Sequence, residues 1–586
     1  MSGMMKTRVW TILAAAGLAA RLSAAPAAAP RISLAPCKLQ GVPREVRCGR
    51  MEVWENRARK AGRKISLRVV VVPATGSERA PDPVFLFAGG PGESAVEAAA
   101  GAAAGNAEIN RKRDLVLVDV RGTGDSNGLQ CPSLQGHAGV LGFLESFLPA
   151  AGVRECRKRL EPRADLALYT TANAVDDVND VRAALGYDRI NLEGGSYGTF
   201  AALVYMRRHP RHVRTAVLES VVPPGTRAPL FFARDAQRAL DQVIAACAKD
   251  AGCHAAFPDV RGDVARLLSR LEAKPAEVTI KDAKTGEPRK IVLGRSAAAQ
   301  TIRYMLYLPI TAAQIPLQAH MAAGGDYSRL AEGAYLWGNL AASLSDGFFL
   351  SVTCAEDVPF FTSAEAEAEA RGTFLGDFRT RVQKAACAEW PRGEVPPGFD
   401  LPVKSEAPAL LVSGERDPVT PAADAESAAK HLPHAKRVVI PGAGHDYEGE
   451  KGAEECISRV AAALIESGTE AGLDTSCVAA IVPVPFALRD DRAAEVAIPE
   501  AELDRFAGAY AGPDGHEFVV RRRGAALQVV LGEGREFLLT PVGASRFRIE
   551  GAPPGYFVEF QRDGESVTGM QIEEGPTERS TLKRKP

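Results

Sequence analysis

The sequence carries almost no net charge, because its 71 Lys and Arg residues are balanced by 72 Asp and Glu residues. A chain without an overall field is not drawn electrostatically to nucleic acid or to an anionic membrane surface. We therefore expect no nucleic-acid partner, and we interpret the basic run at 521–523 as a solvated strand face. Hydrophobic residues make up 46% of the chain and charged residues 24%, which is typical of a globular protein.

Long hydrophobic runs are absent after the N-terminus, where residues 9–20 form one short apolar stretch. Lys6 and Arg8 precede this stretch and small residues at 23–25 follow it, so residues 1–25 are predicted to be a signal peptide. The stretch is too short for a comfortable membrane span, and the alternative is an uncleaved anchor in the membrane interface. The pattern predicts an exported protein, periplasmic or extracellular, with no stable membrane span after cleavage.

The sequence has no CxxC pair, which disfavours a zinc site and a thioredoxin-type redox motif. It has ten cysteines, an even number behind a signal peptide, which indicates disulfide bonds formed in an oxidising compartment. Local pairing is the simplest expectation, and the sequence leaves the connectivity open. The cysteines fall into five sequential couples: Cys37 and Cys48, Cys131 and Cys156, Cys247 and Cys253, Cys354 and Cys387, Cys456 and Cys477.

No internal repeat of fixed period is present, and the chain instead alternates apolar strands with helical segments. Nearly continuous apolar runs suit strands that are buried on both faces of a parallel sheet. Such alternation predicts an α/β fold with right-handed crossovers. The predicted strands are 51–54, 65–72, 83–87, 114–120, 190–193, 214–221, 407–412 and 437–440.

The stretch from 223 to 403 interrupts this strand series and is mostly helical in pattern, with a break expected at Gly324-Gly325. We interpret it as a cap inserted over the C-terminal edge of the sheet. After a Pro-, Ala- and Glu-rich connector, short alternating strands separated by glycine-containing turns predict a barrel-like antiparallel β-domain. The predicted organisation is signal peptide 1–25, linker 26–45, first part of the α/β core 46–222, helical cap 223–403, second part of the core 404–485, linker 486–502 and C-terminal β-domain 503–586.

The sequence Gly194-Gly195-Ser196-Tyr197-Gly198 fits G-x-S-x-G and falls between a predicted strand and a predicted helix. In that context a sharp turn lifts the serine hydroxyl above the sheet, so Ser196 is the candidate nucleophile. The N–H of Tyr197 is one candidate donor to an oxyanion, and Gly90 in the loop after the third strand is the other. The alternative for that loop is an ordinary Gly-Pro turn.

A serine nucleophile needs a base and an acid that orients the base, in the chain order Ser, Asp, His for this arrangement. Asp417 and His445 each follow a predicted strand, at the sheet edge where functional loops gather. Glu415 and Asp446 are the rival acids; the first lies early in its turn and the second is adjacent to the histidine in sequence.

The motif Asp119-Val120-Arg121-Gly122-Thr123-Gly124-Asp125-Ser126 ends the fourth predicted strand. We interpret it as structural, with a buried Asp and Arg that brace the floor of the active site. A direct role for Arg121 in substrate binding is the alternative.

Three of these motifs together resemble the proline iminopeptidase and tripeptidyl aminopeptidase family of serine peptidases. They are the elbow at 194–199, the Gly-Gly-Pro-Gly loop at 89–92 and the Asp-x-Arg-Gly-Thr-Gly-x-Ser motif at 119–126. The resemblance covers roughly residues 40–485 and is greatest to the exported tripeptidyl aminopeptidase branch. It implies an α/β-hydrolase fold, that is, a mostly parallel sheet flanked by helices with an inserted helical cap. It also implies hydrolysis near the free N-terminus of a peptide.

In this family acidic groups of the cap hold the substrate α-ammonium, and the resemblance points to Glu356, in Cys354-Ala355-Glu356-Asp357, with Glu219 as a second candidate. The alternative for Glu356 is a solvated cap carboxylate. The sequence departs from the family at Ala88, where iminopeptidases usually have His, and in its C-terminal β-domain, which lies outside the familiar peptidase unit.

The expected function is therefore hydrolysis of short peptides through an acyl-enzyme on Ser196, with His445 as base, Asp417 as orienting acid and no cofactor or metal. An esterase or amide acylase on the same three residues is the first rival, because a fold does not determine its substrate. A binding protein whose β-domain is the working part is the second rival. The oligomeric state and the preferred residues are left open.

Overall fold

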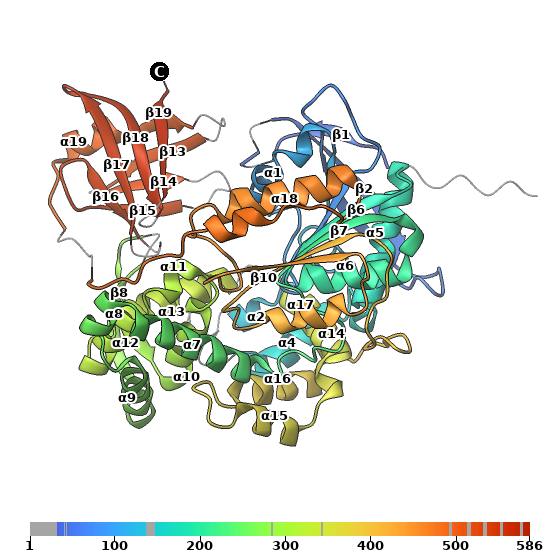
Figure 1. The fold of residues 1–586 in the computed structure, drawn as a ribbon, viewed down its shortest axis with the longest axis horizontal. Helices are drawn as coiled ribbons and strands as arrows, with labels where there is room; N and C mark the ends of the chain where they lie inside the picture. Colours follow the sequence, from blue (N-terminus) through green and yellow to red (C-terminus); the bar gives the residue numbers. More distant parts are fainter. Residues whose placement is uncertain are drawn as a thin grey trace, which may run out of the picture.

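The computed structural model describes residues 32–585 except 40, 43, 136–146, 283–284, 342–343, 491–494, 513–516, 525, 531–535, 551, 553–554 and 575–577. It has three parts: an α/β core, a cap inserted into the core, and a C-terminal barrel (Figure 1). The predicted signal peptide lies outside the described residues. No described helix is long and apolar enough to cross a membrane.

The core is built on a nine-stranded sheet in the order β1-β2-β3-β5-β4-β6-β7-β10-β11. The strands from β5 to β11 pair in parallel, while β1, β2 and β3 add an antiparallel edge. All four residues of β5 are buried, as the continuous apolar run predicts. The strands are β1 (Ala35–Cys37), β2 (Val46–Trp54), β3 (Lys64–Val72), β4 (Val84–Phe87), β5 (Leu115–Val118), β6 (Ile190–Gly195), β7 (Val213–Glu219), β10 (Ala409–Gly414) and β11 (Ala435–Ile440).

Helices cover both faces of this sheet. One hydrophobic cluster joins the sheet to α5 (Thr171–Leu185), α6 (Tyr197–Arg208) and α17 (Ala422–Ala429), and another joins it to α1 (Ala99–Gly105) and α18 (Ala453–Ser467). The expected α/β-hydrolase architecture is therefore present, and the loops that follow β4, β6, β10 and β11 lie at one edge of the sheet.

The cap lies between β7 and β10 and has its own apolar core. The predicted break is present, since α12 ends at Gly324 and Gly325 has a left-handed φ of 104°. The cap is mostly helical, as predicted, and it also contains a hairpin of β8 (Ala276–Lys281) and β9 (Pro288–Leu293) that the sequence pattern did not indicate. The cap helices are α7 (Phe232–Lys249), α8 (Ala251–Ala256), α9 (Val260–Ala273), α10 (Arg295–Met305), α11 (Pro309–Ala312), α12 (Ile315–Gly324), α13 (Ser328–Ala341), α14 (Asp346–Glu356), α15 (Ser363–Ala370) and α16 (Phe378–Ala388).

The C-terminal domain is a closed antiparallel barrel of β12–β19, preceded by α19 (Glu500–Phe506), and confirms the barrel-like prediction (Figure 1). The six strands between the first and the last strand of the barrel agree with the predicted series. They are β13 (Glu517–Arg523), β14 (Ala526–Val530), β15 (Glu536–Pro541), β16 (Arg546–Ile549), β17 (Tyr556–Asp563) and β18 (Ser566–Glu574). The pattern missed β12 (Gly508–Ala511) and β19 (Glu578–Arg584), whose mutual pairing closes the barrel. One is short and rich in small residues, and the other is mostly polar, so neither has a clear apolar alternation.

The barrel contacts both other parts of the chain. The hydroxyl of Tyr556 donates to Glu448 Oε1 at 2.7 Å, three residues beyond His445. Lys281 in the cap hairpin donates to Glu495 at 3.0 Å and to Thr540 at 3.3 Å. Described residues of the predicted linker 486–502 thus contact the cap, with Asp490 paired to Arg329 and Glu495 to Lys281.

The ten cysteines form five disulfides, and each joins one of the sequential couples, so local pairing is confirmed. The bond between Cys37 and Cys48 ties β1 to β2. Strand β1 lies within the segment 26–45 that composition indicates as a linker. That segment is therefore not a linker throughout, because part of it is an edge strand of the sheet.

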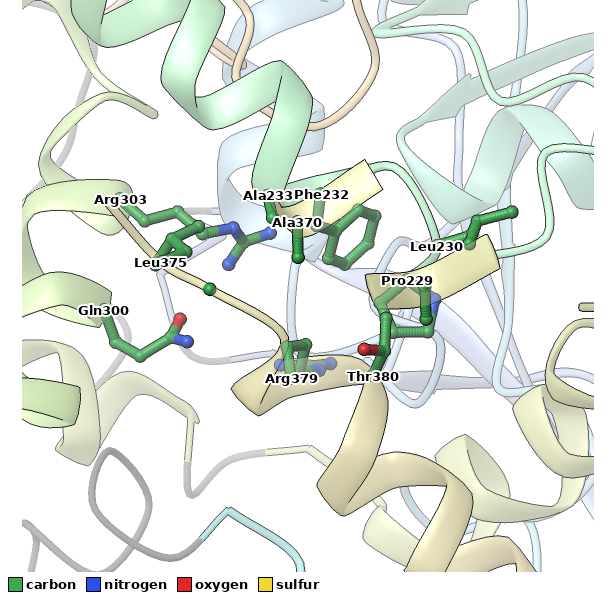
Figure 2. Close-up of a pocket in the computed structure, with 12 residues that line it drawn as sticks. Pro229, Leu230, Phe232, Ala233, Gln300, Arg303, Ala370, Leu375, Arg379 and Thr380 are labelled. Carbon is green, nitrogen blue, oxygen red and sulfur yellow. The ribbon is translucent and has the colours of Figure 1, made fainter. Parts of the chain in front are cut away.

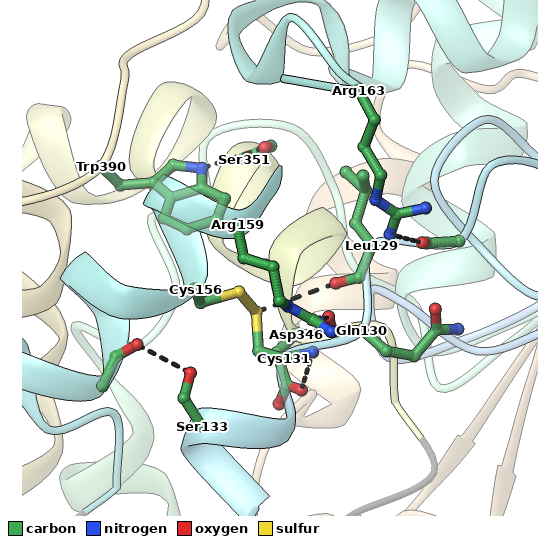
Figure 3. The surroundings of a disulfide bond; sticks show 12 residues. Leu129, Gln130, Cys131, Ser133, Cys156, Arg159, Arg163, Asp346, Ser351 and Trp390 are labelled. Atoms are coloured by element: carbon green, nitrogen blue, oxygen red, sulfur yellow. Dashed lines mark hydrogen bonds between the residues drawn. A yellow bond between two sulfur atoms is a disulfide. The ribbon is translucent and has the colours of Figure 1, made fainter. Parts of the chain in front are cut away.

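The disulfide between Cys131 and Cys156 lies within the core, in a part of the core that contacts the cap (Figure 3). The N–H of Cys131 donates to Asp346 Oδ2 at 3.3 Å, at the start of α14. Trp390 lies beside the bond and donates from Nε1 to Ser351 Oγ at 3.0 Å, also on α14. The core next to this disulfide thereby contacts α14, the cap helix that ends at Glu356.

Arg121 is fully buried and forms an ion pair with the fully buried Asp177. Its guanidinium donates to both Asp177 oxygens, at 2.7 and 2.9 Å, and to the carbonyl oxygens of Glu55 and Leu168. Asp119, from the same motif, accepts from Ser94 Oγ at 2.6 Å. These contacts agree with the structural interpretation of the motif, and a buried Arg121 has no access to substrate.

Replacing Asp177 with alanine is expected to lower the free energy of unfolding by about 3–5 kcal/mol, because the buried Arg121 would lose its carboxylate. Asp180→Ala is the matched control, since Asp180 pairs with Arg57 at 2.8 Å but its side chain is 41% exposed. The control should change stability by less than about 1 kcal/mol. Chemical denaturation of both variants gives the comparison, and equal losses would contradict the buried-pair account.

Candidate active site

Ser196 lies in a sharp turn between β6 and α6, with φ 55° and ψ −125°. Its N–H donates to the carbonyl oxygen of Glu219 at 2.9 Å, which fixes the turn against the end of β7. Glycine is needed two residues before Ser196 and two residues after it. A Cβ on Gly198 would lie 2.1 Å from the Phe87 carbonyl oxygen, and one on Gly194 would lie 2.6 Å from the Gly198 carbonyl carbon. The turn has the strained geometry expected of a nucleophile elbow.

Asp417 and His445 are brought together by the loops that follow β10 and β11. Asp417 is fully buried, and its Oδ2 lies 2.9 Å from His445 Nδ1. The two loops can approach because position 414 is glycine: a Cβ there would lie 1.8 Å from the Gly444 carbonyl oxygen. The geometry matches an acid that orients an imidazole through one ring nitrogen.

Further hydrogen bonds hold this pair in place. Asp417 Oδ1 accepts from the N–H groups of Val419 and Thr420, both at 2.8 Å, and Oδ2 accepts from Thr420 Oγ at 2.6 Å. Ser220 Oγ donates to the carbonyl oxygen of His445 at 2.5 Å. Thr420 and Ser220 cannot be identified from the sequence, because small hydroxyl residues near strand ends are too common to be distinctive.

The rival acids have other partners. Glu415 Oε2 accepts from the N–H of Gly442 at 2.9 Å and so braces the loop before the histidine. Asp446 Oδ1 accepts from the N–H of Tyr447 at 2.6 Å. Asp417 is the carboxylate that the described structure places on the His445 ring.

The loop 88–92 follows β4 and lies against the first turn of α6, where Tyr197 is the first residue. Gly90 lines the same cavity as Ser196, while the N–H of Gly89 donates to Glu93 Oε2 at 3.0 Å. The structure therefore places the loop 88–92 against the elbow, and the role of Gly90 and Tyr197 as oxyanion donors stays a prediction. The Tyr197 hydroxyl lies 2.7 Å from Thr171 Oγ, so the side chain packs away from the cavity.

A cavity of about 560 Å³ lies between the core and the cap, and Ser196 and His445 both line it. Its size suits a short peptide or another small molecule. The cap contributes aromatic and charged side chains: Phe232, Arg303, Tyr304, Tyr307, Trp337, Phe349, Asp357 and Arg379. Among the described residues, no group of three or more His, Cys, Asp or Glu side chains is placed to hold a metal ion.

Only one of the two residues expected to bind the substrate amine lines the cavity. Glu219 lines the cavity and accepts from the Tyr447 hydroxyl at 2.9 Å. Glu356 does not line it: its oxygens accept from the N–H of Thr171 at 2.6 Å and from Thr171 Oγ at 2.7 Å. The next residue, Asp357, lines the cavity instead, because successive residues at a helix end point about 100° apart.

Several pKa values in the site are shifted. Burial would lower the pKa of His445, but the charge of Asp417 and its hydrogen bond raise that pKa overall. Burial raises the pKa of Asp357 to about 7, partly offset by the N–H of Ala228. Burial, followed by the nearby Glu193, raises the pKa of Glu219 to about 7. Burial raises the pKa of Glu356 to about 8. Such shifts cluster at functional sites.

A family model described as the alpha/beta hydrolase fold matches residues 82–447 of the chain. The chain therefore belongs to the α/β-hydrolase fold family, and the motif-based resemblance to serine peptidases is confirmed by its relatives.

Among those relatives is a tripeptidyl aminopeptidase of Streptomyces coelicolor, 26% identical over 519 residues that cover 80% of this chain and 89% of that protein. Serine protease Hip1 of Mycobacterium tuberculosis is 25% identical over 75% of this chain and 90% of its own length. Carboxylesterase B of the same organism is 28% identical over 64% of this chain and 76% of its own length. A proline iminopeptidase structure from Mycobacterium smegmatis covers 72% of this chain and all of its own, with 17% identity and a TM-score of 0.33.

Proposed function

We propose that the chain is an exported serine peptidase that hydrolyses short peptides from a free N-terminus, like a tripeptidyl or prolyl aminopeptidase. The observation that carries the proposal is the 2.9 Å contact between His445 and the buried Asp417 beside a cavity that Ser196 also lines. The relatives named as a serine protease and as tripeptidyl aminopeptidases support the substrate class. The five disulfides are consistent with export.

In the proposed reaction, His445 Nε2 takes the proton of Ser196 as Oγ attacks the scissile carbonyl carbon. Asp417 holds the Nδ1–H of the ring and stabilises the imidazolium that forms. The N–H groups of Tyr197 and Gly90 donate to the oxyanion. His445 then gives its proton to the leaving amine, and water activated by the same ring hydrolyses the acyl-enzyme.

We propose further that Asp357 and Glu219, rather than Glu356, pair with the substrate α-ammonium. Both carboxylates line the cavity, whereas both oxygens of Glu356 are occupied by Thr171. A buried carboxylate is stable in the charged form only with a counter-charge, and an ammonium group supplies one.

Activity is expected to rise with pH through an acid limb above about 6.5, the usual pKa of histidine. His445 must be neutral to accept a proton, and the net effect of Asp417 is to raise its pKa. A pH profile of kcat/KM for an uncharged ester gives this limb directly. A midpoint well below 6.5 would contradict the assignment of His445 as the base.

The peptidase proposal is tested with matched fluorogenic tripeptides, one with a free N-terminus and one N-acetylated, beside a short-chain nitrophenyl ester. We expect cleavage of the free peptide and little cleavage of the blocked one. Cleavage of the ester alone would favour the esterase alternative, which the carboxylesterase relative also represents.

Asp357→Asn is expected to raise KM for the free peptide by about 10-fold or more, because a charge-assisted hydrogen bond contributes about 1.5–3 kcal/mol. Glu356→Gln is the matched control, since a pKa of about 8 leaves Glu356 mostly protonated at neutral pH and Gln resembles that form. The ester should respond to neither substitution. A KM change that is larger in Glu356→Gln than in Asp357→Asn would indicate that Glu356 binds the substrate ammonium.

A further inference from the structure

Two arginines of the cap point into the cavity above the candidate catalytic residues. Arg303 belongs to α10 and Arg379 to α16, and both line the main cavity. Both also line a small adjoining cavity, which is the one drawn in Figure 2. Figure 2 shows the two guanidinium groups entering the same space from different helices, beside Phe232. The two side chains are far apart in sequence, so only the packing of the cap brings them together.

Neither guanidinium has a carboxylate partner among the described residues. Arg303 is only 2% exposed, and its Nη2 donates to the uncharged Tyr307 hydroxyl at 2.9 Å. Its Nε is buried and has no hydrogen-bond acceptor within the described part of the chain. Arg379 donates from Nε to Gln383 Oε1 at 3.1 Å, and the hydroxyl-bearing Tyr304 and Tyr307 also lie near it.

Aromatic rings surround the pair. The Arg379 guanidinium lies 3.8 Å from the ring centre of Phe147, and that of Arg303 lies 4.7 Å from the ring centre of Phe232. Burial, together with the nearby Arg303, lowers the pKa of Arg379 to about 10. A buried and a half-buried cation that repel each other are unfavourable unless an anion joins them.

We propose that Arg303 and Arg379 form a subsite that binds a carboxylate of the substrate, an inference that rests on the proposed peptidase function. A guanidinium presents planar donors that match the two oxygens of a carboxylate, so the pair suits this anion. The carboxylate comes either from an acidic side chain or from the C-terminus of a short peptide. The first source makes the enzyme selective for acidic residues, and the second makes it selective for short chains.

The subsite is close to the proposed chemistry. Arg303 bonds the Tyr307 hydroxyl, and the Tyr307 ring centre lies 4.9 Å from that of His445. One side chain, Tyr307, therefore separates Arg303 from the candidate base. The acidic residues Glu219 and Asp357 line the same cavity, so the site offers opposite charges to the two ends of a short peptide.

The test measures peptide binding to the full mature chain carrying Ser196→Ala, which cannot turn the ligand over. Three ligands are compared by calorimetry: Ala-Ala-Ala-amide, Ala-Ala-Ala with a free C-terminus, and Ala-Ala-Glu-amide. We expect at least one carboxylate ligand to bind about 10- to 100-fold more tightly than the neutral amide, as charge-assisted hydrogen bonds provide. The identity of the tighter ligand distinguishes the C-terminal source from the side-chain source.

Arg379→Met and Arg303→Met, each added to Ser196→Ala, should remove this preference. Arg381→Met is the matched control, because Arg381 is on the same helix as Arg379 but its side chain is 64% exposed. Arg379→Gln provides a polar second variant if a methionine variant unfolds. Equal binding of the three ligands, no binding of either carboxylate ligand, or a preference that survives in the Arg379 variants overturns the subsite.

Failure of the proposed function has a different outcome. Peptides that bind with the expected preference, but that the chain with Ser196 intact does not cleave, would contradict the peptidase and leave the carboxylate subsite standing. Cleavage of free-amine peptides by the chain with Ser196 intact, without any preference for a carboxylate ligand in the binding test, would support the peptidase and overturn the subsite.

Discussion

Ser196→Ala is expected to lower kcat by about 10⁵- to 10⁶-fold, the loss seen when a serine nucleophile is removed from such a site. The hydroxyl is the atom proposed to form the acyl bond, and no other side chain can replace it in the elbow. Residual turnover above the uncatalysed rate is expected, because the oxyanion donors and the cavity remain. Steady-state kinetics on the best free-amine peptide gives the ratio.

The matched control is Ser458→Ala, since Ser458 lies on α18 and donates to the Gly105 carbonyl oxygen, away from the cavity. Its kcat should stay within about 2-fold of the parent, as expected for a substitution that touches no functional group. Near-native circular dichroism of both variants establishes that they are folded. A Ser196→Ala chain that retains a tenth of the activity would contradict the proposed nucleophile.

Asp417→Asn is expected to lower kcat by about 10⁴-fold with little change in stability. The amide can donate to His445 Nδ1 and so favours the tautomer that carries its proton on Nε2, which cannot accept the serine proton. The substitution also removes the negative charge that raises the pKa of His445. The acid limb of any residual activity should therefore move to lower pH.

Glu415→Gln tests the rival acid, because Glu415 is near the same loops but accepts from Gly442 instead of His445. We expect it to change kcat by less than about 10-fold. A loss in Glu415→Gln that matches the loss in Asp417→Asn would contradict the assignment of the acid.

The positions of Ser196, Asp417 and His445 at strand ends could be predicted because each depends on local pattern. Apolar strands, the glycines at 194 and 198 and the turn residues are all visible in sequence, and strand order follows from the α/β topology. The local disulfide pairing could be expected for the same reason. The closing strands of the barrel could not, because their pairing partners are far apart and their own pattern is weak.

Cavity-lining residues of the cap were predicted less well. Glu356 and Asp357 are adjacent in sequence, and which of them faces the cavity depends on where α14 ends. The sequence does not indicate that Arg303 and Arg379 line the cavity, because two isolated arginines on separate predicted helices are typical of solvated surface charges. Their meeting is a property of how α10 and α16 pack, and this can be seen only in three dimensions.

The central claim is that Ser196 is an activated nucleophile, and covalent labelling tests it most directly. The mature chain is treated with a fluorophosphonate, and the adduct is located by peptide mapping with mass spectrometry. We expect one adduct on Ser196, formed faster as pH rises through the acid limb, and none in Ser196→Ala. An adduct on another residue, or no reaction in the folded protein, would contradict it.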